Sequence, residues 1–470
     1  MNAPRPATVS AREAEVIAAL GAGLSNAQIA RRLHISVRTV EGHVSSLLRK
    51  YGVADRRALV ARSATPSSFT APGGVAGLVG SRTTFIGRHE DRRAVLDALD
   101  RHGLVTLVGP GGVGKTRVAE AVAEAAAAGF PYGAAFVDLV PVRHDALAQA
   151  VAAVLGVAEP AHQSIDVGVV ERLGRGRSLL VLDNCEHLTD TVAAFVDRIL
   201  AVCPVTVLAT SRERLGLPGE RVLSVAPLPL CSAEELFHDR AAMADSEYVR
   251  DETIVSRLCT RLDGLPLAIE LAAARGGALG LTGLLTGLDD CLRLLTGGRG
   301  PVARHRSLRT VISWSHDLLT GDERAAFRRF SVFAGDFDLA AAAEVAGEHV
   351  ATVADMVGRL VDKNLLTRRG GPAGRWRMLD TVRAFAAERL RESREHADVR
   401  HRHLCWASAA AADLLAGLDG DWHDRFDALA GDARAALAGV PRRPDPVAYR
   451  LASTVARLAF ARRFVGEAVA

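Results

Sequence analysis

Apolar residues recur at helical spacing in three short segments at the start of the chain. In the first segment, "VSAREAEVIAAL", Ser10 and Glu13 form a predicted capping box before the apolar positions begin. The second segment begins at Ser25 and ends near His34, and the third begins at Ser36 after a tight turn. We expect the following positions to face inward: Val16, Ile17, Leu20, Ala27, Ile29, Ala30, Leu33, Val37, Val40, Val44, Leu47 and Leu48. This layout, with a polar outer face on the last helix, predicts a helix-turn-helix unit that places its second helix in the DNA major groove.

The hydrophobic pattern changes after residue 100 to short, continuous apolar runs separated by helical segments. The runs lie at residues 104–108, 134–140, 178–184, 205–211 and 221–228. Continuous apolar runs of this length are typical of parallel strands that are buried on both faces. The region is therefore predicted to form a parallel α/β sheet with helices between its strands.

Two further regions, residues 62–84 and the chain beyond residue 400, differ from the α/β region in composition and hydrophobic pattern. Residues 62–84 are rich in Ser, Thr, Pro and Gly and have no sustained period, which predicts a linker. Beyond residue 400, "HLCWASAAAADLLAGL", "DWHDRFDALAGDARAALAGV" and "YRLASTVARLAFARRF" predict successive Ala-rich amphipathic helices. Helical repeats can begin here, although this stretch is too short to establish a repeat period of about 20–50 residues.

Positive charge is concentrated at the N-terminus. Residues 1–62 contain ten Arg and Lys against four Asp and Glu, a net charge of +6, whereas the whole chain has a formal net charge of +4. The rest of the chain is therefore slightly acidic. A locally basic helix-turn-helix unit favours binding to the phosphates of duplex DNA.

Composition argues against several other classes of protein. The six Cys form no CxxC pair, which argues against a metal site or a disulfide framework. The longest apolar stretch, residues 265–288, is interrupted by Glu270 and Arg275, and the N-terminus lacks the apolar core of a signal peptide. We therefore expect a cytoplasmic protein that does not enter a membrane.

The segment "LVTLVGPGGVGKTRVAEAVAEA" carries a phosphate-binding motif between a strand and a helix. It fits G-x-x-x-x-G-K-[ST] at Gly109, Pro110, Gly111, Gly112, Val113, Gly114, Lys115 and Thr116. The glycines let backbone N–H groups converge on phosphate oxygens, and Lys115 reaches the β- and γ-phosphates. The Thr116 hydroxyl can ligate Mg²⁺. The next residue, Arg117, is included in the predicted ATP/ADP site.

Polar residues at two strand ends complete the predicted nucleotide site. Asp183 ends the apolar run "SLLVLDN" and is predicted to help place Mg²⁺. Arg212 follows the next run, at the edge of the sheet where ligands of α/β proteins bind, and is predicted to sense the γ-phosphate. Asn184 follows Asp183 in place of a second acid, which leaves Glu186 as the nearest alternative general base and predicts slow hydrolysis.

The segment "LSNAQIARRLHISVRTVEGHVSSLLRKYGVADRRALV" resembles the LuxR-type helix-turn-helix domain, and the resemblance covers residues 8–62. It implies that Thr39, His43, Arg49 and Lys50 hold phosphates. It also implies that Glu41, Gly42 and Ser45 approach base edges, with Arg38 on the same polar face. Glu41 stands where a basic residue is common in the family.

Residues 85 to about 395 resemble the STAND class of signal-transduction ATPases, the NB-ARC-like group of bacterial regulators. The segments that carry this resemblance are "FIGRHED", "TSRERLGL", "DGLPLAIELAA" and "RWRMLDTVRAFA". The resemblance implies that Ile86 and Arg88 lie near the adenine and ribose and that Pro266 packs against the base from a helical subdomain. In "MLD", Leu379 stands where the family has a phosphate-contacting histidine in a winged-helix subdomain.

These observations predict a multidomain fold: an all-α helix-turn-helix, an α/β P-loop NTPase with helical and winged-helix subdomains, and C-terminal helices. The expected boundaries are a LuxR-type domain at 1–64, a flexible linker at 65–84, an α/β P-loop domain at 85–228, a helical subdomain at 229–300, a winged-helix-like subdomain at 301–395 and a helical region at 396–470.

The expected function is a transcriptional regulator that is switched by ATP and ADP and is at most a slow ATPase. We expect promoter DNA, a second copy of the chain in the ATP state, RNA polymerase and an unidentified effector as partners. The alternative is a P-loop enzyme that remodels DNA or protein and is recruited to DNA by the helix-turn-helix. The rate of ATP turnover distinguishes the two.

Overall fold

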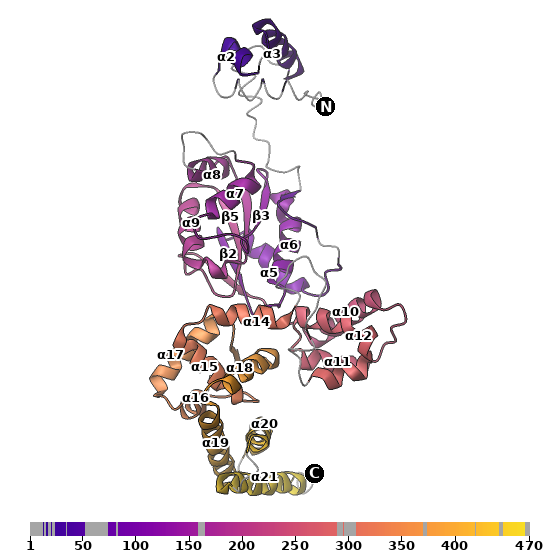
Figure 1. The fold of residues 1–470 in the computed structure, drawn as a ribbon, viewed down its shortest axis with the longest axis vertical. Coiled ribbons are helices and arrows are strands. Elements are labelled where there is room, and N and C mark those ends of the chain that lie inside the picture. The colour runs from indigo at the N-terminus through magenta and orange to yellow at the C-terminus, as the bar shows by residue number, and fades with distance from the viewer. Residues whose placement is uncertain are drawn as a thin grey trace.

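The structure of the chain is a computed structural model. It describes residues 13, 16, 20, 24–33, 35–51, 74–80, 83–157, 165–288, 295, 307–369, 374–418, 420–440 and 445–465. In Figure 1 the α/β domain lies above two helical subdomains, and the C-terminal helices extend below one of them. The predicted multidomain order of helix-turn-helix, α/β domain and C-terminal helices is confirmed.

The N-terminal unit contains the two helices of the predicted helix-turn-helix motif, α2 (Asn26–Arg32) and α3 (Val37–Tyr51). Helix α2 begins with the expected cap at Ser25, whose hydroxyl accepts from the Gln28 N–H while the Gln28 side chain accepts from the Ser25 N–H. The core of the unit consists of Val16, Leu20, Ile29, Ala30, Val40 and Leu47.

Two of the inward positions expected for this unit are wrong. Ala27 is exposed and Val37 is 42% exposed. Both lie in the first turn of their helices, before the first fully buried positions, Ile29 in α2 and Val40 in α3. The predicted cap at Ser10, the inward position Ile17 and the helix end at His34 lie outside the described residues.

The α/β domain contains a parallel six-stranded sheet in the order β1-β3-β4-β5-β2-β6. The strands are β1 (Val75–Ala76), β2 (Leu104–Val108), β3 (Ala134–Asp138), β4 (Ser178–Asp183), β5 (Val205–Ser211) and β6 (Arg221–Ser224). The helices of the domain are α5 (His89–Leu99), α6 (Lys115–Ala126), α7 (Leu147–Leu155), α8 (Ile165–Leu173) and α9 (Thr189–Val202). Alternate residues of each central strand face different cores: Leu179 and Val181 lie in one cluster, and Leu180 lies in the other. This two-sided burial explains the continuous apolar runs.

The end of the predicted linker belongs to this sheet. Val75 and Ala76 pair with Ala134 and Ala135 as an edge strand. Further along, the Thr83 carbonyl accepts from the Arg117 guanidinium at 2.9 Å. Residues 74–80 and 83–84 of the expected 65–84 linker are therefore attached to the α/β domain, and residues 65–73, 81 and 82 lie outside the described residues.

The helical subdomain consists of α10 (Leu230–Ala244), α11 (Glu252–Arg261) and α12 (Pro266–Gly287). By length and hydropathy, α12 is the one helix of the described residues that could cross a membrane. Its first half is an ordinary core helix, because Ala268, Ile269 and Ala272 are fully buried in the protein. The helix changes direction at Gly280, which has a φ of 66°.

The winged-helix subdomain combines five α-helices with a short antiparallel hairpin. Its elements are α14 (Leu308–Asp317), α15 (Gly321–Arg329), η5 (Phe330–Val332), α16 (Leu339–Ala346), α17 (Val350–Asp362), β7 (Thr367–Arg369), β8 (Arg375–Arg377) and α18 (Asp380–Glu392). Its core contains Phe327, Phe330, Phe333 and Phe337, all fully buried. The hairpin forms the wing, as the resemblance implied.

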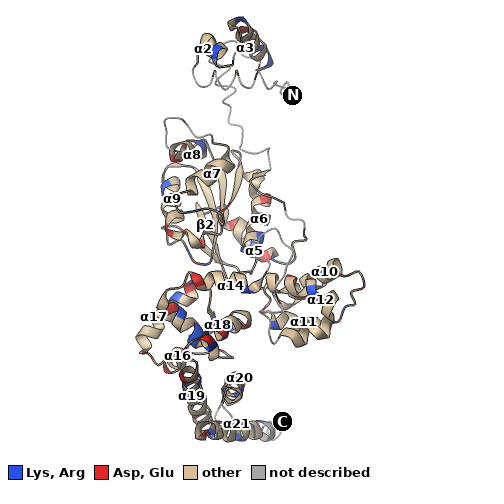
Figure 2. Cartoon of the chain, viewed as in Figure 1, with Lys and Arg blue, Asp and Glu red and all other residues tan. Residues whose placement is uncertain are grey.

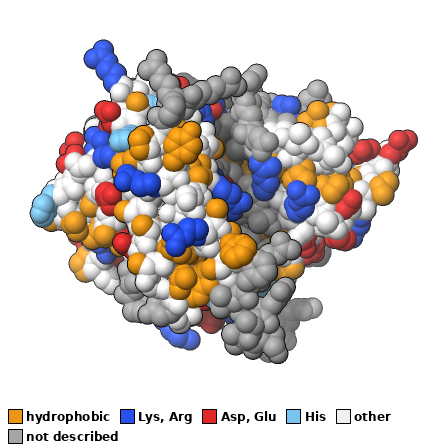
Figure 3. Space-filling model, turned by 90° about the horizontal axis from the view of Figure 1, so that it is seen from below, with side chains coloured by type: hydrophobic (Ala, Val, Ile, Leu, Met, Phe, Trp, Pro, Cys, Tyr) orange, Lys and Arg blue, Asp and Glu red, His pale blue; other side chains and the backbone are white. Residues whose placement is uncertain are grey.

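The C-terminal region consists of α19 (His396–Ala416), α20 (Trp422–Ala438) and α21 (Pro446–Val465), which pack around their own apolar cluster. The predicted amphipathic helices are therefore confirmed. Figure 3 shows the molecule from the side of these helices, where Lys and Arg side chains are interspersed with hydrophobic ones.

Candidate functional site

The phosphate-binding loop connects β2 to α6 with glycines at its tightest points. Gly112 and Gly114 have φ angles of 79° and 96°, a region that side chains strongly disfavour. At Gly109, an added Cβ would lie 2.6 Å from the Val225 carbonyl oxygen. The loop therefore packs closely against the segment that follows β6 and leads into the N-terminus of α6, where backbone N–H groups and the helix dipole favour an anion.

Lys115 begins α6 and is buried. Its Nζ atom lies 2.7 Å from the Gly109 carbonyl oxygen and 3.2 Å from that of Pro110. The ammonium group is thus held inside the loop by weak neutral acceptors. Phosphate oxygens, which carry formal charge, are stronger acceptors for it.

Asp183 lies at the end of β4, beside the loop, and is almost fully buried. The Thr116 hydroxyl donates to the Asp183 carboxylate and lies 2.9 and 3.0 Å from its two oxygens. The Asp183 carboxylate also accepts from the Thr210 hydroxyl and the Asn184 amide. Burial raises the pKa of the Asp183 carboxyl from 3.8 to about 7, and the hydrogen bonds from Thr210 and Thr116 partly oppose this rise. A bound cation would favour the ionised form of this carboxyl.

The Thr116–Asp183 pair fits a Mg²⁺ site. The Thr116 hydroxyl donates its proton to Asp183, so the lone pairs of its oxygen are left for a metal ion. Hydroxyl and carboxylate oxygens are the hard ligands that Mg²⁺ prefers. The predicted metal-binding residues are therefore brought together by the fold.

The other two predicted catalytic residues contact each other. Arg212 Nε lies 3.2 Å from Glu186 Oε1, and both side chains are less than a tenth exposed. The Arg212 guanidinium also lies over the ring of Trp314 in α14, 5.4 Å from its centre. In addition, the Asn364 amide donates to the Arg212 carbonyl oxygen. Two segments of the winged-helix subdomain therefore contact Arg212 at the end of β5.

Asn184 adopts a left-handed conformation, with a φ of 66°, and its amide donates to Asp183. Its side chain is used to fix the neighbouring carboxylate and has no basic group. Glu186 Oε2 is buried without a hydrogen-bond partner in the described part of the chain. Glu186 is therefore the better candidate base, and its other oxygen is engaged by Arg212.

Of the residues expected near the adenine and ribose, Pro266 lies beside the P-loop, Ile86 packs against the core, and Arg88 is hydrogen-bonded to backbone carbonyl groups. Pro266 is the first residue of α12, and the adjacent Leu267 N–H donates to the Gly112 carbonyl oxygen at 3.2 Å, so the GLPL segment lies against the P-loop. Ile86 is half-buried against the core. Arg88 donates to the carbonyl oxygens of Ala226 and Val113 at 2.6 and 2.7 Å. Arg88 thus connects the segment that follows β6 to the P-loop, and its contact with ribose stays a prediction.

Sequence reasoning missed three residues that the fold brings to this site. Thr210 was visible as a strand end, but its hydrogen bond to Asp183 depends on two adjacent strands. Trp314 and Asn364 lie more than 100 residues after Arg212, and no local motif marks either.

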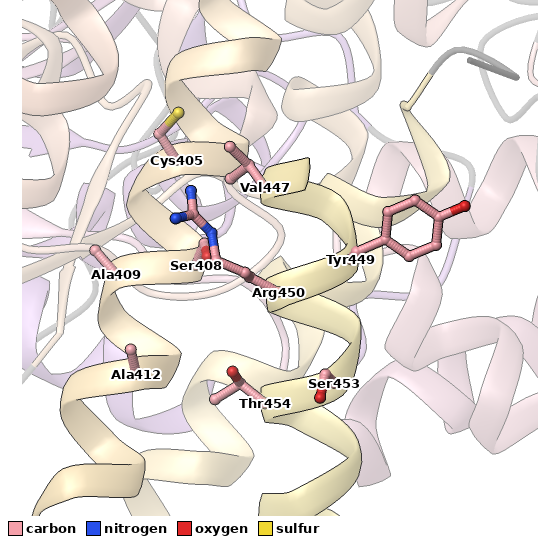
Figure 4. Close-up of a pocket in the computed structure, with 9 residues that line it drawn as sticks. All are labelled: Cys405, Ser408, Ala409, Ala412, Val447, Tyr449, Arg450, Ser453 and Thr454. Atoms are coloured by element: carbon pink, nitrogen blue, oxygen red, sulfur yellow. The ribbon is translucent and has the colours of Figure 1, made fainter. Parts of the chain in front are cut away.

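Two cavities lie away from the P-loop. A groove of about 570 Å³ between α19 and α21 is lined by Cys405, Ser408, Ala409, Ala412, Val447, Tyr449, Arg450, Ser453 and Thr454. Figure 4 shows Arg450 extending toward α19, whereas Tyr449 points away. A second cavity of about 420 Å³ is lined by Val142, Arg143, His144, Asp145, His187 and Leu188. Neither contains a residue of the predicted nucleotide site.

The predicted DNA-reading helix α3 presents most of its polar side chains to solvent. Arg38, Thr39, Glu41, Ser45 and Arg49 are exposed, and His43 is half-buried. Figure 2 shows the charged residues on α2 and α3. This arrangement leaves the polar face of α3 open to a DNA groove.

Lys50 differs from the other predicted phosphate-binding residues. Its Nζ lies 2.6 Å from Glu13 Oε2, and the Ser46 hydroxyl donates to the other oxygen of Glu13 at 2.8 Å. Glu13 itself is only 5% exposed. Lys50 therefore has a structural partner inside the unit, and its contact with DNA stays a prediction.

Alanine variants of the neighbouring residues Arg49 and Lys50 separate these roles. Arg49→Ala is expected to reduce the slope of log affinity against log salt by about one, because one phosphate contact is lost. Lys50→Ala is expected to destabilise the unit by about 1.5–3 kcal/mol, since the buried Glu13 carboxylate loses a charged hydrogen-bond donor. DNA titrations of the full chain at several salt concentrations, with thermal unfolding of each variant, test this. Equal changes in salt slope without loss of stability would instead place Lys50 on a phosphate.

Two known protein families match parts of this chain. The family of bacterial regulatory proteins of the luxR type matches residues 7–63. A winged helix-turn-helix domain matches residues 319–391. These matches confirm the LuxR-type resemblance and the winged-helix prediction.

Two mycobacterial relatives match most of the chain. Rv0890c of Mycobacterium tuberculosis, whose name describes an HTH-type transcriptional regulator, is 43% identical over 355 residues, which are 72% of this chain and 40% of that protein. Rv0894 of the same organism is 42% identical over 329 residues, which are 67% of this chain and 83% of that protein. The chain therefore spans less than half the length of Rv0890c but most of Rv0894.

Among solved structures, the Walker-type ATPase PABY2304 of Pyrococcus abyssi is similar to this chain at 14% identity and a TM-score of 0.48. The match covers 65% of this chain and 96% of that one. The assignment of a P-loop fold rests on the strand order and on the loop geometry described above.

Proposed function

We propose that this chain, which belongs to the same family as Rv0894 of Mycobacterium tuberculosis, is a transcriptional regulator that is switched by ATP and ADP. The luxR-type domain at residues 7–63 would bind promoter DNA. The P-loop domain would hold the nucleotide that decides between a closed and an open form. RNA polymerase and an unidentified effector are further proposed partners, and the cytoplasm is the proposed location.

The observation that carries this proposal is the contact of the winged-helix subdomain with Arg212. Trp314 covers the guanidinium, and Asn364 binds the carbonyl group of the same residue. Arg212, which would bind the γ-phosphate at the end of β5, is therefore also in contact with the winged-helix subdomain. Movement of Arg212 toward a phosphate would change both contacts at once.

Different residues of the site would bind the phosphates and position the Mg²⁺ ligand. The loop N–H groups and Lys115 would bind the phosphates, and Asp183 would hold the Thr116 hydroxyl in place. Mg²⁺, when bound, would supply neutralising charge for the phosphate oxygens. A nucleotide can switch the protein only if it binds the two forms with different affinity, and Arg212 supplies that difference for ATP.

Hydrolysis is proposed to be slow and to reset the switch. Asn184 has no basic group to accept a proton from water, and Glu186 is held by Arg212 at 3.2 Å. The ATP form is proposed to associate with itself once the winged-helix subdomain has moved. Under the alternative function, a remodelling enzyme, Glu186 would have to be released from Arg212 in every cycle.

Identification of the bound nucleotide and of the turnover rate tests the proposal. The purified chain is expected to carry mostly ADP and to hydrolyse ATP well below about 10 s⁻¹, a typical enzyme rate. A larger particle mass is expected with a non-hydrolysable ATP analogue than with ADP. Rapid turnover together with equal mass in both nucleotides would favour the remodelling enzyme.

A further inference from the structure

Asp263 connects the helical subdomain to the winged-helix subdomain through the start of α18. It lies in the turn between α11 and α12, with a φ of 56°. One carboxylate oxygen accepts from the Asp380 N–H at 3.0 Å. The other accepts from the Thr381 N–H at 2.8 Å and the Thr381 hydroxyl at 2.9 Å.

These contacts form a helix cap supplied from a residue 117 positions earlier in the chain. The first N–H groups of any helix have no partner within it, and a carboxylate at that end also interacts favourably with the helix dipole. The residue at the usual capping position of α18 is Leu379, which makes no side-chain cap. We name the contacts of Asp263 with Asp380 and Thr381 the Asp263 cap.

The same turn reaches the phosphate-binding loop on its other side. Four residues after Asp263, the Leu267 N–H donates to the Gly112 carbonyl oxygen. The packing is close, because an added Cβ on Gly112 would lie 3.1 Å from the Cβ of Leu267. Gly264 fixes the turn itself, since its carbonyl accepts from the Leu228 N–H at 2.9 Å. A short turn, residues 263–267, therefore contacts the P-loop at one end and α18 at the other.

Leu379 leaves the winged-helix subdomain without a phosphate-contacting side chain at this position, so the contact through Asp263 is a second route from the P-loop to α18. Its half-buried side chain packs against the core and has no group that can donate to a phosphate. Burial raises the pKa of the Asp263 carboxyl, while the backbone N–H groups of Thr381 and Asp380 partly oppose that rise. The N–H and hydroxyl donors at this cap therefore favour an ionised carboxylate.

We propose that the Asp263 cap holds the winged-helix subdomain closed and carries movement of the P-loop to α18, an inference that rests on the proposed nucleotide switch. A shift of Gly112 on nucleotide exchange would displace the start of α12 and, with it, the carboxylate that caps α18. The released subdomain would then separate from the helical subdomain.

Hydrogen exchange and small-angle scattering of the full chain test the cap. Asp263→Gly removes the carboxylate without strain, because Gly tolerates a positive φ. Thr381→Val removes one donor and keeps the shape of the side chain. For Asp263→Gly, the first-turn amides of α18 are expected to exchange about tenfold faster, which corresponds to about 1.4 kcal/mol. The radius of gyration with ADP is expected to approach that of the wild type with a non-hydrolysable ATP analogue.

A matched control comes from the same subdomain. Asp251 caps α11 by accepting from the Ile254 N–H at 2.9 Å, and it makes this contact within the helical subdomain. Asp251→Gly is expected to speed exchange in α11 alone. An equal effect of Asp251→Gly on α18, or slow α18 exchange in both Asp263→Gly and Thr381→Val, would overturn the inference.

The measurement also separates this inference from the proposed function. If the wild type has the same radius of gyration with ADP and with the ATP analogue, the nucleotide switch itself fails. If the wild type responds to nucleotide and Asp263→Gly keeps both that response and slow exchange in α18, the switch stands and the inference about Asp263 fails.

Discussion

Replacing Lys115 with Ala is expected to weaken the binding of ATP and of ADP at least about 30-fold. The ammonium group is buried within the loop, 2.7 Å from the Gly109 carbonyl oxygen, where an incoming phosphate would replace that weak acceptor. Loss of one partner from a buried, charge-assisted contact costs about 2–5 kcal/mol, and 1.4 kcal/mol is a tenfold change in affinity. Isothermal titration of nucleotide-stripped protein measures the loss directly.

Lys363 provides the matched control. It is one of three lysines in the chain and forms an ion pair with Glu323 at 2.7 Å in the winged-helix subdomain. Lys363→Ala is expected to change nucleotide affinity by less than about twofold, because the Lys363 ammonium is held by Glu323 of the winged-helix subdomain and is not part of the phosphate-binding loop. A similar loss in both variants would show that nucleotide binding responds to general destabilisation, and unchanged affinity in Lys115→Ala would contradict the P-loop assignment.

The P-loop fold could be predicted because its signal is local. The residues 109–116 fit a motif whose spacing is set by one strand, one loop and one helix, and the apolar runs around it are buried on both faces. The same local logic placed Asp183 and Arg212 at strand ends on one edge of the sheet. It failed at Ala27 and Val37, where helical periodicity continues beyond the part of each helix that is packed.

The contacts between subdomains could not be predicted in this way. Trp314 and Asn364 meet Arg212 only after about a hundred intervening residues have folded, and neither stands in a recognisable motif. Asp263 was visible within the GLPL segment, but its capping role depends on where α18 begins. Spacing within one segment cannot report a hydrogen bond between two segments whose relative position is set by packing.

Replacing Arg212 with Ala is expected to remove the difference between ATP and ADP in driving self-association, a loss of at least about tenfold in preference. In the closed arrangement the guanidinium contacts Glu186 and Trp314, so a γ-phosphate would have to attract it away from both. ADP lacks that phosphate, and its affinity is therefore expected to change by less than about twofold. A charge-assisted contact of this kind is worth about 1.5–3 kcal/mol, enough for the expected loss.

Arg212→Ala also lowers the stability of the fold, and this effect must be distinguished from the loss of nucleotide preference. Arg212→Ala leaves the Glu186 carboxylate buried without its cation, which destabilises the fold. The double variant Glu186→Gln/Arg212→Ala removes that charge as well and is expected to lose nucleotide preference while regaining stability. Arg198→Ala, at an exposed ion pair with Asp166, is the control and is expected to keep the preference. If both Arg212 variants distinguish ATP from ADP as the wild type does, by particle mass measured with each nucleotide, another group reads the γ-phosphate.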